Sequence, residues 1–89
     1  MSEEGKFQLR IKAFTLSTCG FCRLFKRFME KHHIPFEYVD IDQLNGEERE
    51  AVVQKADEYC PGCGYPIIVV GREVIRGFDE ERLREVLRI

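Results

Sequence analysis

The chain has 89 residues, enough for one small domain, and a formal net charge of −2. Its acidic and basic residues are intermixed, whereas nucleic-acid-binding proteins usually carry clustered Lys and Arg and a high pI. No apolar run approaches the about 20 residues of a membrane-spanning helix, and the first residues are acidic and polar, unlike a secretory signal. We therefore expect a cytoplasmic protein with neither nucleic acid nor membrane as a partner. We also expect a monomer, although nothing in the composition decides the oligomeric state.

The first half of the chain predicts a strand, a helix and a second strand. Apolar and polar residues alternate over residues 7–14, which is the periodicity of a strand. After a turn-like segment, apolar residues recur from Phe21 to Met29 at the spacing of one helical face. Pro35 forbids continuation of this helix. Residues 36–41 follow as a second strand.

The second half predicts a helix, a hairpin and a last helix. Asn45 is the expected cap of a helix that runs to about residue 59, because Asn is favoured at this position and acidic residues follow in the first turn. Residues 67–70 and 73–76 are predicted strands joined by a tight turn. Asp79 is expected to cap the last helix.

The resulting element order is βαβαββα. Two strands joined through a helix lie parallel with a right-handed crossover, and the final hairpin adds antiparallel strands. The sequence therefore predicts an α/β fold with a mixed four-stranded sheet and three helices on its two faces. Residues 1–6 are expected to form a flexible tail, and residues 7–89 to form the domain.

Cys19 and Cys22 stand where the first strand gives way to the first helix. The thiolate is the attacking form of cysteine, and the unpaired N–H groups and dipole at a helix N-terminus favour this anion. Cys19, at the cap, is the expected nucleophile. Cys22, one turn further and more buried, is the expected resolving thiol, because it can attack a mixed disulfide on Cys19. Half of a zinc site is the alternative for such a Cys-x-x-Cys pair.

Cys60 and Cys63 form a second Cys-x-x-Cys pair, and the sequence leaves its role open. Cysteines of a cytoplasmic protein are more often catalytic or metal-binding than structural. The first alternative is a second redox pair that relays a disulfide. The others are a zinc or iron–sulfur site built with Cys19 and Cys22, a local structural disulfide, and two free, partly exposed thiols.

Three segments of the chain resemble glutaredoxins. Residues 14–22 are similar to the active-site segment of that family, and Tyr65-Pro66 stands where the family carries its cis-proline. Residues 75–80 resemble the glycine–acid loop before the last helix. The resemblance implies a glutaredoxin-like domain with the thioredoxin-like fold. It also implies a thiol–disulfide oxidoreductase, an electron carrier that reduces protein or small-molecule disulfides.

The resemblance further implies a substrate groove beside Cys19. The residues expected to bind substrate there are Tyr65, Pro66, Gly77, Phe78 and Asp79. It implies no resident cofactor, and a reductase or glutathione as electron donor. Leu16 stands where glutathione-using members carry a basic residue, and Arg76 replaces a loop glycine. These departures make an enzyme-linked donor an equal alternative to glutathione.

Overall fold

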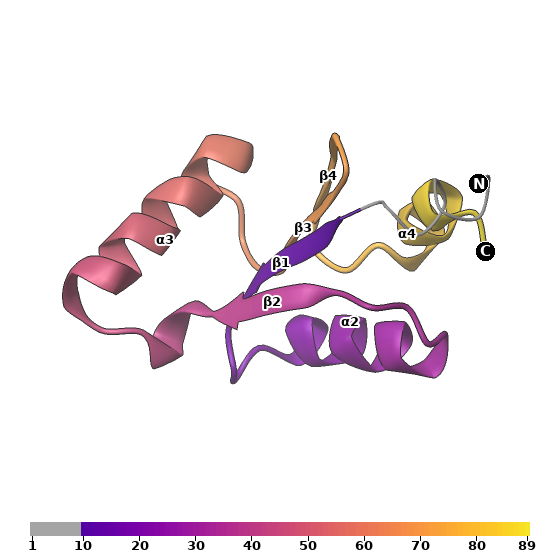
Figure 1. Cartoon of the computed structure of the whole chain (residues 1–89), viewed down its shortest axis with the longest axis horizontal. Coiled ribbons are helices and arrows are strands. Elements are labelled where there is room, and N and C mark those ends of the chain that lie inside the picture. Colours follow the sequence, from indigo (N-terminus) through magenta and orange to yellow (C-terminus); the bar gives the residue numbers. More distant parts are fainter. Residues whose placement is uncertain (1–9) are drawn as a thin grey trace.

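The computed structural model describes residues 10–89. Its elements follow the predicted order βαβαββα, with one short 3-10 helix added (Figure 1). They are β1 (Ile11–Thr15), α2 (Gly20–Lys31), β2 (Glu37–Asp40), η1 (Ile41–Gln43), α3 (Gly46–Tyr59), β3 (Ile67–Val70), β4 (Glu73–Arg76) and α4 (Glu80–Leu87). The predicted tail, and residues 7–9 of the first predicted strand, lie outside the described residues.

The four strands form one mixed sheet in the order β2-β1-β3-β4. β1 pairs with β2 in parallel, as the helical connection between them requires, and with β3 antiparallel. β3 and β4 form the antiparallel hairpin. The register of the parallel pair places Thr15 opposite Asp40, which brings the ends of β1 and β2 together beside the first cysteine pair.

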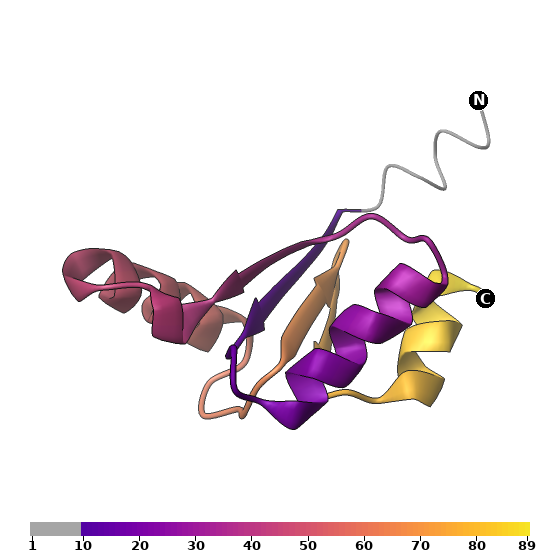
Figure 2. The same ribbon diagram turned by 90° about the horizontal axis from the view of Figure 1, so that it is seen from below.

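Helices cover both faces of the sheet, because alternate strand residues point to opposite faces. In β1, Ala13 belongs to a core cluster that includes Phe25 of α2 and Leu83 of α4. The next residue, Phe14, belongs to a second cluster with Ala56 of α3. Thus α2 and α4 pack on one face and α3 on the other (Figure 2).

The structure differs from the predicted elements at a few ends. β2 stops at Asp40, and Ile41 begins η1 instead of ending the strand. Asn45 is the cap residue of α3 as predicted, but its side chain makes no capping hydrogen bond. Asp79 caps α4 through a hydrogen bond from the backbone N–H of Arg82. No helix among residues 10–89 is both long and apolar enough to cross a membrane.

Candidate active site

Cys19 occupies the N-cap position of α2. Its backbone is extended, with φ −84° and ψ 123°, and its Sγ accepts a hydrogen bond from the backbone N–H of Cys22 at 3.4 Å. This sulfur replaces the side-chain oxygen that commonly caps a helix. Partial burial raises the pKa of the Cys19 thiol. Hydrogen bonds from Cys22 and from the backbone N–H of Phe21 lower this pKa by a larger amount. The net effect is a pKa below the ordinary value, which favours the thiolate.

Cys22 is fully buried in the first turn of the same helix. Its Sγ accepts a hydrogen bond from the backbone N–H of Leu16 at 3.4 Å. Burial, reinforced by the hydrogen bond and charge of Cys19, raises the pKa of Cys22 to about 12. The two thiols are therefore unequal, as predicted: one is accessible and acidic, and the other is buried and keeps its proton.

The loop before β3 lies against the first cysteine. The Tyr65–Pro66 peptide bond is cis, and the carbonyl oxygen of Tyr65 lies 3.7 Å from Cys19 Sγ. The backbone N–H of Gly77 donates to the carbonyl oxygen of Pro66 at 2.8 Å. The three segments that suggested the glutaredoxin resemblance therefore meet at one end of the sheet.

Some of the predicted substrate residues face an open hollow, and others are engaged in packing or helix capping. Tyr65 and Gly77 line an open hollow of about 520 Å³, together with Arg76 and Cys63. The ring of Phe78, in contrast, packs edge-to-face on Phe28 with centroids 5.9 Å apart, and forms part of the core boundary. Asp79 uses one carboxylate oxygen to cap α4. Their roles in substrate binding stay predictions.

Two carboxylates at or just after the end of β2, which the sequence indicated only as turn residues, support the segment before Cys19. Asp42 accepts hydrogen bonds from both the backbone N–H and the hydroxyl of Ser17. These bonds lower the pKa of Asp42 below its ordinary value. The carboxylate of η1 therefore fixes the chain two residues before the nucleophile.

The second carboxylate, Asp40, links β1, β2 and α2. It accepts a hydrogen bond from the buried hydroxyl of Thr15 at 2.5 Å and pairs with the ammonium of Lys26 at 3.0 Å. Lys26 also lies 4.1 Å from the centre of the Tyr38 ring. The only sequence signal for this group is its place at the ends of adjacent strands, and that signal depends on the strand register.

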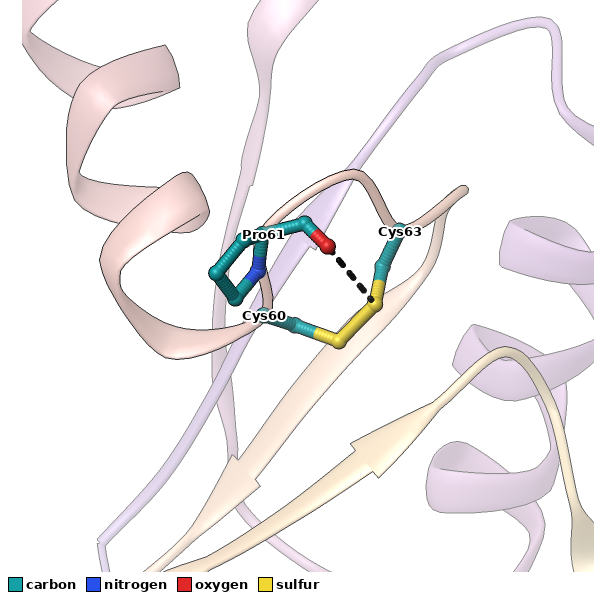
Figure 3. The surroundings of a disulfide bond; sticks show 3 residues. All are labelled: Cys60, Pro61 and Cys63. Atoms are coloured by element: carbon teal, nitrogen blue, oxygen red, sulfur yellow. Dashed lines mark hydrogen bonds between the residues drawn. A yellow bond between two sulfur atoms is a disulfide. The ribbon is translucent and has the colours of Figure 1, made fainter.

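Cys60 and Cys63 form a disulfide with their Cα atoms 5.6 Å apart (Figure 3). Cys60 is the C-cap residue of α3, and the carbonyl oxygen of Pro61 lies 3.9 Å from Cys63 Sγ. Among residues 10–89, no group of three or more His, Cys, Asp or Glu side chains is arranged to hold a metal ion. The geometry thus gives no support to the four-cysteine zinc or iron–sulfur alternative.

The fold and the paired thiols define the class: a small thioredoxin-like protein with a Cys-x-x-Cys pair at a helix N-terminus. The glutaredoxin family model matches residues 11–75. The chain therefore belongs to the glutaredoxin family, as the sequence resemblance indicated. This membership implies thiol oxidoreductase activity.

Solved structures agree with this assignment. The glutaredoxin grx-1 of Archaeoglobus fulgidus is 32% identical, with a TM-score of 0.84 over 92% of this chain and 89% of that chain. Methanoredoxin of Methanosarcina acetivorans is 30% identical, with a TM-score of 0.85 over 90% and 85%. A glutaredoxin of Methanosarcina mazei Go1 is also 30% identical, with a TM-score of 0.80 over 90% and 79%. No curated protein matches the chain.

Proposed function

We propose that this protein reduces disulfides of proteins or small molecules, with Cys19 as nucleophile and Cys22 as resolving thiol. The observation that carries the proposal is the asymmetry of the pair. Cys19 Sγ is partly exposed and accepts a backbone N–H hydrogen bond at the helix N-terminus, whereas Cys22 is fully buried one turn away. An accessible, acidic thiol attacks first, and a buried neighbour resolves.

The reaction proceeds by two exchanges. The Cys19 thiolate attacks one sulfur of the substrate disulfide, whose S–S bond breaks, and the other sulfur leaves and takes up a proton. Cys22 then loses its proton and attacks Cys19 Sγ, which expels the second substrate sulfur. The substrate gains two electrons and two protons, and a Cys19–Cys22 disulfide forms. A donor dithiol, or two molecules of a monothiol, reverses these steps and restores the thiols.

The donor is either glutathione or the dithiol of a reductase. Leu16 is apolar and packs against the core cluster around Phe14, and an uncharged side chain supplies no cation beside the site. Arg76 is exposed and lines the hollow next to Tyr65 and Gly77, where its guanidinium can bind a carboxylate of the donor. An Arg76→Gln variant tests this use. Slower reduction by glutathione, with unchanged reduction by dithiothreitol, would support glutathione as donor.

Turnover of a protein disulfide tests the proposed function itself. With insulin as substrate and dithiothreitol as donor, the wild type should accelerate reduction, and Cys19→Ser should abolish the acceleration. Cys22→Ser should still react with substrate once, and the mixed disulfide on Cys19 should be visible in the intact mass. Undiminished turnover by Cys19→Ser would contradict the assignment of the nucleophile.

A further inference from the structure

The second cysteine pair is a reactive group that the proposed function leaves unused. Cys60 is 7% exposed and packs in the core cluster with Phe14, whereas Cys63 is half-buried and lines the hollow beside Tyr65. An incoming sulfur can therefore reach Cys63 far more easily than Cys60. The pair has the same division into an accessible and a buried sulfur as Cys19 and Cys22.

Cys63 also lies on the loop that contacts the nucleophile. It precedes Tyr65, whose carbonyl oxygen is 3.7 Å from Cys19 Sγ, by two residues. Two residues of extended chain span at most about 7 Å. Cys63 stands between Gly62, which has φ +71°, and Gly64. Glycines leave the backbone the widest choice of conformation, so a released Cys63 can swing toward Cys19.

The two pairs sit at opposite ends of helix dipoles. Cys19 caps the N-terminus of the 12-residue α2, where a thiolate is stabilised, and Cys60 caps the C-terminus of the 14-residue α3, where a thiolate is disfavoured. A stabilised thiolate favours the reduced form of its pair, as in strongly oxidising disulfides. Two shared electrons should therefore reside on Cys19 and Cys22.

We propose that Cys60 and Cys63, when reduced, form a second dithiol that returns electrons to the Cys19–Cys22 disulfide. One chain then delivers two electron pairs. This inference rests on the proposed function of Cys19 and Cys22. The Cys63 thiolate attacks Cys19 Sγ, and Cys22 leaves and takes up a proton. Cys60 loses its proton, attacks Cys63 Sγ and expels Cys19. Two electrons and two protons pass from the second pair to the first.

Electron counting tests the relay. The full-length chain is reduced with dithiothreitol, freed of reductant without oxygen, and mixed with excess bis(2-hydroxyethyl) disulfide. The wild type should reduce two equivalents of this probe, and Cys63→Ser should reduce one. When only one equivalent is supplied, alkylation and peptide mass mapping should find thiols at Cys19 and Cys22 and a disulfide at the second pair. Cys19→Ser should consume the probe far more slowly than the wild type.

Each contrary result has a separate meaning. One equivalent in both wild type and Cys63→Ser would overturn the relay and leave the proposed function standing. Oxidation of the second pair at an undiminished rate in Cys19→Ser would also overturn it, because Cys63 would then react directly with the probe. No consumption by either the wild type or Cys63→Ser would overturn the proposed function together with the relay.

A trapping experiment checks that the two pairs meet. The Cys22→Ser/Cys60→Ser variant holds only the thiols of Cys19 and Cys63. Oxidised glutathione should convert it to a monomer with an internal Cys19–Cys63 disulfide. The matched variant Cys22→Ser/Cys63→Ser, which keeps the buried Cys60, should form this bond at least tenfold more slowly. Equal rates in the two variants, or only intermolecular dimers, would contradict the relay.

Discussion

The backbone N–H of Cys22 donates a hydrogen bond to Cys19 Sγ, with the nitrogen and sulfur atoms 3.4 Å apart. The same turn of helix therefore stabilises the thiolate of one cysteine while it buries the other. The acidities of the two thiols separate because hydrogen bonds at the helix cap lower the pKa of Cys19, whereas burial, reinforced by Cys19 itself, raises the pKa of Cys22.

Selective alkylation should report the difference between the two thiols. The pKa of Cys19 lies below its ordinary value, and that of Cys22 is raised to about 12. A pKa of about 12 leaves a thiolate fraction of roughly 10⁻⁵ at neutral pH. Iodoacetamide at neutral pH should therefore modify Cys19 and leave Cys22 free, as peptide mass mapping can show. Lowering the pH through the pKa of Cys19 should slow the reaction. Equal labelling of both thiols would contradict the assigned burial.

The buried hydroxyl of Thr15 should contribute measurably to stability. Thr15 is inaccessible to solvent, and its Oγ1 lies 2.5 Å from Asp40 Oδ1 and 3.1 Å from the carbonyl oxygen of Val39. Thr15→Val keeps the shape but removes the donor, which typically costs about 1–3 kcal/mol for a buried group. Urea unfolding should show this loss, and Thr15→Ser should recover most of it. An unchanged midpoint in Thr15→Val would mean that this hydrogen bond adds nothing.

The sequence predicted the elements and the first cysteine pair because their signals are local. Alternation in β1, helical periodicity in α2 and a cap at Asp79 all depend on residues within one or two turns of one another. Cys19 could be recognised for the same reason, since its chemistry follows from its place at the start of a helix.

The partners of Asp40 and Asp42 could not be predicted, because they are distant in the chain. Asp40 meets Thr15 only through the register of two parallel strands, and Asp42 meets Ser17 only because η1 follows β2. Similarly, the spacing of Cys60 and Cys63 allowed a metal site, a dithiol or a disulfide. The turn after α3 brings the two Cα atoms to 5.6 Å, the separation at which the structure has a disulfide, and this turn could not be read from the spacing alone.

The link between Asp42 and Ser17 should make stability depend on acid pH. Hydrogen bonds from the Ser17 hydroxyl and backbone lower the pKa of Asp42 in the folded chain. A lowered folded pKa adds stability above the unfolded pKa, and this stability is lost as the pH falls through the folded value. Asp42→Asn should therefore melt at a lower temperature than the wild type at neutral pH, and the gap should shrink on acidification. A gap that stays constant between neutral and strongly acid pH would contradict this linkage.

The exposed ring of Phe21 should matter for protein substrates and not for small ones. Phe21 follows Cys19 by two residues and is 61% exposed, so a protein substrate docked on Cys19 can cover its ring. Full burial of a Phe side chain is worth about 1.5–3 kcal/mol. A bound protein substrate should bury the Phe21 ring only in part, so Phe21→Ala should raise KM for insulin about tenfold. Its rate with bis(2-hydroxyethyl) disulfide should be unchanged. Ile89, 47% exposed at the C-terminus, is the control for an exposed apolar side chain away from Cys19, and Ile89→Ala should behave as the wild type. Equal losses with both substrates would instead mean that Phe21 supports the site and does not contact the protein substrate.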